Sequence, residues 1–270
     1  MSRPLLAVDG DSFAHRAYHA LPKSIFRNAV VGFTNMIVRL WEAERPRAVL
    51  VGWDSLESPT YRHELFPAYQ SGREFEDSIV EQLALLPELC RALRFVVAKV
   101  PGYEADDFLA AAAKAEEARG GTALVASGDR DSFQLASEQT TILFPVRGVS
   151  ELARIGPEEV RERYDVEPAQ VPDFIALRGD PSDRLPGAKG VGPKTAAQLL
   201  RQYGSLEAAL DDGRFSTQAD ELRLYRRIAA MDASAPVPDV TDTEPDWTAG
   251  AALVRDWGLR QLADRLEKRA

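Results

Sequence analysis

Residues 94–118, RFVVAKVPGYEADDFLAAAAKAEEA, place an apolar run, a Pro-Gly break, three acids and a helical pattern in direct succession. The run RFVVAKV is typical of a buried strand, and DDFLAAAAKAEEA has apolar residues at the three-and-four spacing of a helix. Carboxylates favour the first turn of a helix, because its free N–H groups and its dipole attract negative charge. The stretch predicts a strand–turn–helix unit. It leaves open whether Glu104, Asp106 and Asp107 only cap the helix or also take part in chemistry.

The same alternation of strand and helix runs through the first half of the chain. Further apolar runs indicate strands at residues 5–8, 48–53, 122–127 and 140–145, and helical patterns span residues 30–44 and 80–93. Such alternation is typical of a mostly parallel sheet covered by helices on both faces. We therefore predict an α/β domain over residues 1–160.

After about Ile155 the strand signal stops, and short helical patterns follow one another. They are GPEEVRERY, VPDFIALRG, PKTAAQLLRQY, SLEAALDDG and ELRLYRRIAAM. Residues 232–248 are rich in Pro, Asp and Thr, which indicates an extended connector before a last helix. We predict a helical domain over residues 161–250 and a C-terminal helix over residues 251–270.

Composition narrows the class of protein. One cysteine, Cys90, excludes an intrachain disulfide and a cysteine metal site. No stretch has the pattern of a signal peptide or the roughly 20 apolar residues of a membrane span. We expect a soluble cytoplasmic protein without a membrane partner. The net charge of −9 argues against a nucleic-acid partner, unless many acids gather in one place and bind cations.

Acidic residues follow four of the predicted strands at their carboxyl ends. In an open parallel sheet, functional sites lie beyond those ends, so these acids are expected at one edge. A further pair lies in RGDPSDRLPG, residues 178–187, and joins them if that loop folds back over the sheet edge. The nine acids are Asp9, Asp54, Glu104, Asp106, Asp107, Asp129, Asp131, Asp180 and Asp183. Asp11 is expected to cap the helix that follows it.

A cluster of nine acids needs raised pKa values or bound cations. Two carboxylates about 5 Å apart repel by about 3 kcal/mol at an effective dielectric constant near 20. Hard divalent cations with oxygen ligands are the natural partner, and Mg²⁺ takes a few carboxylates while keeping several waters. Two such ions form the clamp that is used for phosphodiester hydrolysis. The cluster therefore predicts two Mg²⁺ or Mn²⁺ ions.

A glycine-rich turn opens the helical pattern in LPGAKGVGPKTAAQLL, residues 185–200. Gly190 and Gly192 form the turn, and Lys194 and Thr195 fall in the first turn of the helix. Free N–H groups at such a helix start bind an anion, which would hold a phosphate without reading base sequence. The spacing excludes a Walker A loop. An ordinary connection between two helices remains the alternative.

These motifs together resemble the 5′-nuclease family, which comprises the 5′→3′ exonuclease domain of bacterial DNA polymerase I and the stand-alone flap endonucleases. The matching stretches run in the family's order over roughly residues 4–210. They are LLAVDGDSFAHRAYHAL, VGWD, YRHELFPAYQSGR, VPGYEADDFLA, SGDRDSFQL and ALRGDPSDRLPGAKGVGPKTAAQLL. The resemblance implies a PIN-like nuclease domain followed by a helix-three-turn-helix DNA-binding domain. It also implies cleavage of DNA near a free 5′ end, at flaps, nicks or pseudo-Y junctions.

Roles of single residues follow from the resemblance by position. Asp9, Asp54, Glu104 and Asp106 are implied to bind the first metal, and the other five acids the second metal or its waters. Arg16, Arg62 and Arg73 are implied to surround the scissile phosphate or the threaded strand, where guanidinium groups suit bidentate contact. The hairpin at residues 190–194 is implied to bind duplex phosphate with a potassium ion. The expected DNA contacts are Gly190, Gly192, Lys194, Thr195, Lys189 and Gln70.

The chain departs from the family pattern at a few positions. Gln70 stands where the family usually has a lysine, so the site lacks one positive charge, and we expect slower cleavage. Arg184 stands where an asparagine is common, and residues 71–82 are too short and acidic for a large basic arch. With no polymerase region in the sequence, we expect the chain to act alone or docked on other proteins.

Two alternatives to a DNA nuclease remain. One is a catalytically weakened protein that binds DNA structures, and the other is an RNA-cutting nuclease of the same fold. Retention of all nine acids argues against a pure binder, because mutually repelling carboxylates destabilise a protein. The glycine-rich hairpin and the helical second domain favour duplex DNA.

Overall fold

The sheet is mostly parallel, as the sequence predicts. The structure is a computed structural model that describes residues 3–55, 58–72, 75–147 and 151–270. Six strands stand in the order β3-β2-β1-β4-β5-β6, and within the described residues only β6 runs antiparallel to its neighbour. The strands are β1 (Leu5–Asp9), β2 (Ala48–Gly52), β3 (Val96–Ala98), β4 (Ala123–Ala126), β5 (Thr140–Arg147) and β6 (Glu151–Ile155). The first five were predicted. The pattern analysis missed β6, because this short edge strand, ELARI, has a single buried residue and two charged residues that interrupt its apolar positions.

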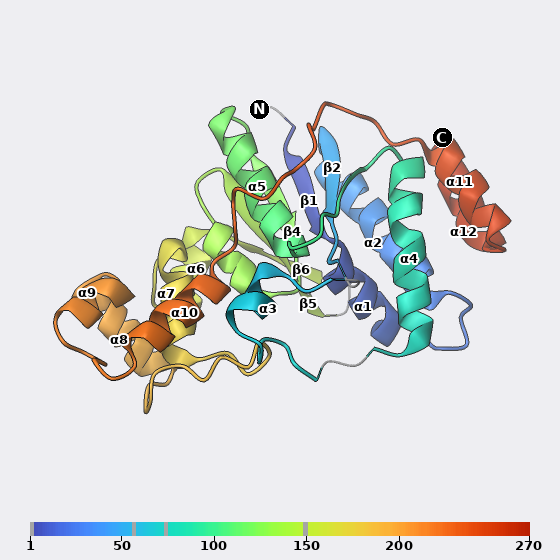
Figure 1. Cartoon of the computed structure of the whole chain (residues 1–270). Helices are drawn as coiled ribbons and strands as arrows, with labels where there is room; N and C mark the ends of the chain where they lie inside the picture. The colour runs from blue at the N-terminus through green and yellow to red at the C-terminus, as the bar shows by residue number, and fades with distance from the viewer. Residues whose placement is uncertain (1–2, 56–57, 73–74, 148–150) are drawn as a thin grey trace.

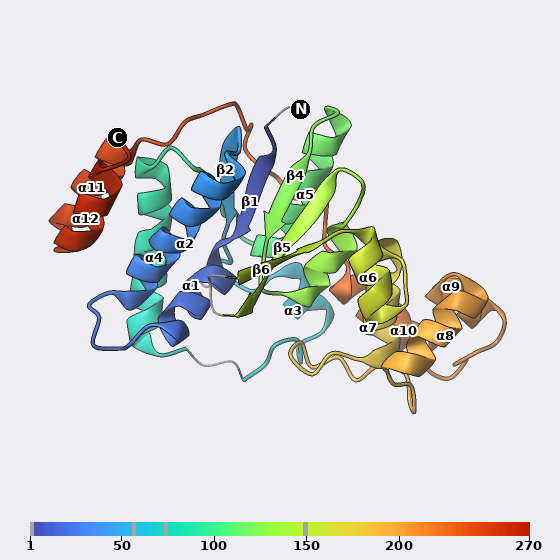
Figure 2. The same ribbon diagram turned by 180° about the vertical axis from the view of Figure 1, so that it is seen from behind.

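Two cores lie on opposite faces of the sheet. Along β1, Leu5 and Ala7 point to one face and Leu6 and Val8 to the other. Helix α5 (Ala105–Ala118) packs on the first face. The second face is covered by α1 (Gly10–Ala20), α2 (Asn28–Glu44) and α4 (Asp77–Ala92), as Figures 1 and 2 show from the two sides.

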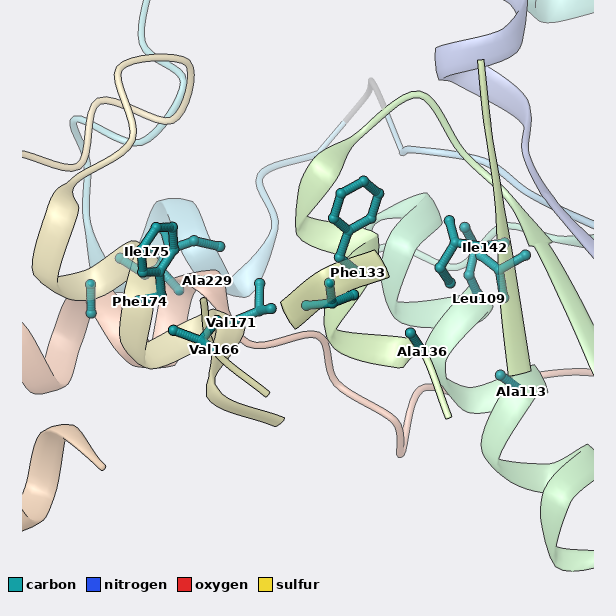
Figure 3. Close-up of a cluster of buried hydrophobic side chains, with 14 of the residues drawn as sticks. Leu109, Ala113, Phe133, Ala136, Ile142, Val166, Val171, Phe174, Ile175 and Ala229 are labelled. Atoms are coloured by element: carbon teal, nitrogen blue, oxygen red, sulfur yellow. The ribbon is translucent and has the colours of Figure 1, made fainter. Parts of the chain in front are cut away.

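The second half of the chain is helical and shares its core with the α5 face of the sheet. Its helices are α6 (Pro157–Tyr164), α7 (Val171–Arg178), α8 (Pro193–Tyr203), α9 (Leu206–Asp211) and α10 (Ala219–Ala229). Phe133, in the short 3₁₀ helix Arg130–Leu135, lies between Ile142 of β5 and the α7 residues Val171 and Phe174 (Figure 3). Short helices also span Tyr61–Leu65 (α3) and Pro168–Gln170. The boundary expected at residue 160 falls inside α6, so it stays a proposal.

The chain then returns to the first half. Residues 230–246 run along α5 to the amino-terminal edge of the sheet, where the N–H of Thr243 donates to the carbonyl of Arg47 at 2.8 Å (Figure 1). Beyond them α11 (Trp247–Asp256) and α12 (Arg260–Glu267) pack beside α4. The single C-terminal helix expected over residues 251–270 is therefore wrong. It is broken at Gly258, whose φ of +82° a helix cannot accommodate.

No helix within the described residues has the length and apolar character needed to span a membrane.

Candidate active site

Acidic side chains gather in one hollow at the carboxyl ends of the strands. The hollow has a volume of about 680 Å³ and receives acids that follow β1, β2, β3 and β4, which are adjacent in the sheet. It also receives the two acids of the loop after α7. The carboxylates that line it are Asp9, Asp11, Asp54, Glu104, Asp106, Asp129, Asp131, Asp180 and Asp183. The structure thus brings together eight of the nine acids singled out in the sequence, and it adds Asp11.

Asp9 takes the capping role that was expected of Asp11, and both carboxylates line the hollow. Asp9 is the N-cap of α1, where its carboxylate accepts the N–H of Ser12 at 2.9 Å and the hydroxyl of Ser127 at 2.8 Å. Asp11 lies in the first turn, and its carboxylate accepts the N–H of Asp54 at 2.7 Å. The expectation that Asp11 caps the helix was wrong, because the helix starts two residues earlier than expected, at Gly10. The DGD spacing, which puts a second carboxylate one residue inside the helix, was the available signal.

Glu104 and Asp106 face the hollow, whereas Asp107 does not. Glu104 is the N-cap of α5, and Asp107 accepts its N–H at 3.1 Å, so the segment is a helix start as predicted. Asp107 is fully buried, and its two oxygens accept N–H groups of Arg62, both at 2.8 Å. With its oxygens occupied by a guanidinium, Asp107, which was expected to be a metal ligand, is not among the acids that the structure brings together in the hollow.

The guanidinium of Arg62 also binds groups of the protein itself. Besides Asp107, its guanidinium contacts Glu104 at 3.4 Å and donates to the carbonyls of Ile228 at 2.9 Å and Ala230 at 3.3 Å. Its side chain lines the hollow but is only 3% exposed. Arg62 thus joins α3, the start of α5 and the end of α10, while its expected role at the scissile phosphate stays a prediction.

The other two predicted arginines are not part of the described lining of the hollow. Arg16 lies against the turn after β4, where a Cβ on Gly128 would stand 2.9 Å from its guanidinium. Its Nε is buried and has no hydrogen-bond partner within the described part of the chain. Arg73 lies outside the described residues.

The loop after α7 folds over the sheet edge because its two ends cross in close backbone contact at Gly179 and Gly187. Asp180 and Leu185 pair as an isolated antiparallel bridge, and Gly179 and Gly187 have φ of +79° and +75°. A Cβ on Gly187 would lie 2.4 Å from the backbone nitrogen of Gly179. This crossing brings Asp180 and Asp183 to the hollow. There Asp180 accepts the N–H of Ser182 at 2.8 Å and a guanidinium N–H of Arg178 at 3.2 Å.

Gln70 links two parts of the acidic hollow. Its amide donates to the hydroxyl of Tyr69 at 2.8 Å and to the carboxylate of Asp183 at 3.0 Å. The Tyr69 hydroxyl in turn donates to Glu104 at 2.9 Å. Gln70 was expected to contact DNA, but the structure directs its amide to protein atoms at the wall of the hollow.

Burial and mutual repulsion raise the pKa values of several of these acids. Burial, with the charges of Asp54 and Asp129, raises the pKa of Asp9 to about 7 despite the two hydrogen bonds that favour its charged form. Burial beside neighbouring carboxylates also raises the pKa values of Asp11, Asp106 and Asp131 well above the usual range. The hollow therefore stabilises cations, either protons or metal ions.

The donor set suits a hard divalent cation. The atoms that the acids offer to an ion are all carboxylate oxygens. One of them, Oδ1 of Asp106, is buried without a hydrogen-bond partner among the described residues. No three of the described acids form a ready-made ligand set around one point. An ion here would therefore take one or two carboxylates and complete its shell with water, which is the habit of Mg²⁺.

The glycine-rich hairpin presents an open surface at the start of α8. Gly192 is the N-cap, Gly190 has a φ of +77°, and a Cβ on either glycine would meet nothing within 4 Å. The side chains of Lys189, Lys194 and Thr195 are exposed.

The chain has a mostly parallel sheet with acids at its carboxyl edge, and small helices follow it. This order defines a two-part class of proteins, in which a resolvase-like domain precedes a SAM-like helical fold. Two family models match the chain in that order. They are "5'-3' exonuclease, N-terminal resolvase-like domain" over residues 4–165 and "5'-3' exonuclease, C-terminal SAM fold" over residues 166–247. The chain belongs to the 5′-3′ exonuclease family.

Similar proteins agree with this assignment. DNA polymerase I of Mycobacterium tuberculosis is 44% identical over 97% of this chain, and that of Bacillus caldotenax is 37% identical over 99%. The chain spans only 28% and 33% of the lengths of these relatives. Among solved structures, the 5′-exonuclease of phage T5 with bound zinc has a TM-score of 0.73 at 20% identity and covers 98% of this chain and 99% of its own. The catalytic core of Rad2 with DNA substrate has a TM-score of 0.63 at 14% identity, covering 98% of this chain and 91% of its own. These two structures confirm the fold.

Proposed function

We propose that this chain hydrolyses DNA phosphodiesters near a free 5′ end, as a 5′→3′ exonuclease and flap endonuclease that depends on divalent metal ions. The observation that carries the proposal is the hollow into which four adjacent strands and the loop after α7 deliver nine carboxylates. Acids with raised pKa values in such a place need cations, and phosphodiester hydrolysis uses two of them. The fold shared with a zinc-bound exonuclease of phage T5 supports the same reading.

The residues of the hollow divide between two Mg²⁺ or Mn²⁺ ions in this proposal. Asp9, Asp54, Glu104 and Asp106 would hold one ion, directly or through its waters, and Asp129, Asp131, Asp180 and Asp183 would hold the other in the same way. Asp11 joins the set, and Asp107 leaves it. When bound, the ions supply an activated water and stabilise the leaving oxygen. Gln70 and Tyr69 keep Glu104 and Asp183 in place.

The hairpin at residues 190–194 would hold the duplex next to the cut. Its open glycines and the free N–H groups at the start of α8 fit a phosphate oxygen. A potassium ion bound by backbone carbonyls of residues 190–194 would add positive charge there. Flaps, nicks and pseudo-Y junctions are the proposed substrates, and solved structures of the T5 flap endonuclease and of Rad2 are complexes with DNA.

One cleavage assay separates this function from its alternatives. The protein is incubated with a 5′-flap DNA, a matching RNA and a blunt duplex, in Mg²⁺ or in EDTA. We expect Mg²⁺-dependent cutting near the flap junction. Preferential cutting of RNA would favour the RNA-cutting alternative, and tight flap binding without cleavage would favour the pure binder.

Matched variants then test the hollow itself. Asp131→Asn or Asp183→Asn is expected to abolish cleavage while flap binding stays near normal. Asp211→Asn removes the same charge from an exposed position on α9 and should leave cleavage unchanged. Full activity of Asp131→Asn would exclude the proposed site.

A further inference from the structure

A second hollow lies beside the acidic one and has the opposite charge. It has a volume of about 510 Å³ and lies between α6, α7 and the start of α8. Its lining contains five cationic side chains and one carboxylate, in a chain whose net charge is −9. The cations are Arg130, Arg163, Arg178, Lys194 and Arg201, and the carboxylate is Asp165.

The two hollows are neighbours that share two lining residues. Arg130 and Arg178 line both of them, so a strand that leaves the acidic hollow on this side meets these two guanidinium groups first. Lys194 lines the far end, in the first turn of α8. The cationic hollow therefore lies between the acidic hollow and the glycine-rich hairpin.

The cations are only partly neutralised by the protein. Arg201 forms an ion pair with Asp165, and Arg178 donates to Asp180 at 3.2 Å while lying over the ring of Phe174. Within the described residues, Arg163 and Lys194 form no ion pair, and both are exposed. Gathered like charges repel, so an anion that lies among them is bound favourably.

The aromatic residues of the hollow indicate which anion fits. Tyr164 and Phe174 stack on each other with ring centroids 5.2 Å apart, and Tyr164 also packs against Phe133 at 5.7 Å. Phe174 is only 2% exposed, so it offers no free face to an unpaired base. Proteins that hold single strands combine positive charge with exposed aromatic faces, whereas the two rings of this hollow stack on each other and Tyr164 is only partly exposed. The hollow suits the phosphates of a duplex, whose bases are already stacked.

We propose that the cationic hollow binds the phosphodiester backbone of the duplex part of the DNA substrate, with Arg163 and Arg201 as phosphate contacts. The proposal rests on the proposed nuclease function and extends the duplex contact from the hairpin to the cationic hollow. Arg163 lies on α6, which precedes the helix pair that carries the glycine-rich hairpin, and no sequence motif marks it.

Salt dependence of binding gives a direct test. The double variant Arg163→Gln/Arg201→Gln is compared with Arg161→Gln/Arg223→Gln, which removes the same charge from exposed arginines outside the hollow. Arg161 lies on the same helix as Arg163 and pairs with Glu167. The Kd for a flap duplex and for a single strand of equal length is measured in EDTA over a range of KCl concentrations.

We expect the hollow variant to bind the flap duplex at least fivefold more weakly. Its slope of log K against log[salt] should be smaller by roughly 1.8, since each lost phosphate contact removes about 0.9. Binding of the single strand should change no more than in the control variant. In Mg²⁺, the KM for the flap should rise while kcat stays near that of the wild type.

Two results would overturn the proposal. The first is equal duplex affinity and salt slope for the two double variants. The second is an equal loss of affinity for duplex and single strand. If the wild type still cuts flaps in either case, the nuclease function stands and only the cationic hollow is rejected. A wild type that neither binds nor cuts DNA would reject both.

Discussion

Glu104, Asp106 and Asp107 are neighbours in the sequence with different tasks in the structure. Glu104 and Asp106 line the acidic hollow, while Asp107 lies beneath it and neutralises the buried Arg62. The sequence pattern predicted the helix start that all three share. It could not separate their tasks, because the partner of Asp107 lies 45 positions away and the pairing depends on how α3 packs.

Asp107→Asn should destabilise the protein strongly. It leaves the Arg62 guanidinium buried without its main counter-charge, which typically costs about 3–5 kcal/mol. Asp106→Asn breaks no ion pair within the described residues, so its free energy of unfolding should stay near that of the wild type. Urea unfolding in EDTA measures both values. A smaller loss for Asp107→Asn than for Asp106→Asn would contradict the buried pair.

Gln70→Lys should raise kcat. The lysine would add a positive charge beside Asp183 and Glu104, where negative charge develops on the phosphate during cleavage. We expect a gain on the order of tenfold, since charged donors in such sites are worth at least that much. Single-turnover cleavage of a flap DNA measures it, with Gln70→Met as the neutral control of similar size. A kcat equal to that of the wild type would show that the missing charge does not limit the reaction.

Each acid owes its position to the element that carries it. Apolar runs and helical spacing predicted five strands and most helices, because buried elements have strong periodic patterns. The same reasoning missed β6, which buries only one of its five residues, and the break at Gly258, because one glycine in a helical pattern is a weak signal. The sequence predicted that Asp180 and Asp183 reach the hollow only if their loop folds back over the sheet edge. That fold depends on the close approach of Gly179 and Gly187, which the sequence pattern does not show.

Gly187→Ala should disturb that loop. The residue has a φ of +75°, and a Cβ would approach the Gly179 nitrogen to 2.4 Å, so the change combines backbone strain with a backbone clash. We expect a loss of about 1–3 kcal/mol of stability and a marked loss of cleavage as Asp180 and Asp183 move.

Gly213→Ala is the matched control for this loop. Gly213 has a φ of +83° and nothing within 4 Å of a Cβ, so it carries the strain without the clash. It should retain cleavage and lose less stability in thermal unfolding. Equal losses of cleavage for the two variants would show that the crossing does not position the acids.

The whole molecule combines strong charges of both signs with a negative total. The carboxylates of the acidic hollow repel one another when no cation is bound, and the cationic hollow beside it attracts polyanions. The net charge of −9 on its own argued against nucleic acid, and only the spatial separation of the charges resolves that conflict.

Mg²⁺ should stabilise the folded protein, because it binds the assembled hollow and not the unfolded chain. At a concentration 100 times the Kd, the gain is about 2.7 kcal/mol. Thermal unfolding in millimolar Mg²⁺ should therefore show a higher Tm than in EDTA with KCl of equal ionic strength. Asp131→Asn should reduce the difference. An equal Tm in the two buffers would contradict a preformed metal site.

The return of the chain along residues 230–246 makes the helical half an insertion within the first half. Arg47 holds this connector through Asp242 and the carbonyl of Val240, and it also pairs with the buried Glu116 of α5. Helices α11 and α12 share the core of α2 and α4. A single protease cut at the exposed residues 238–239 should therefore leave two fragments that elute together on gel filtration and separate only in urea. If the two fragments stay together without denaturant, α11 and α12 are held by packing rather than by the peptide bond. The cut chain would then behave as a self-assembling heterodimer.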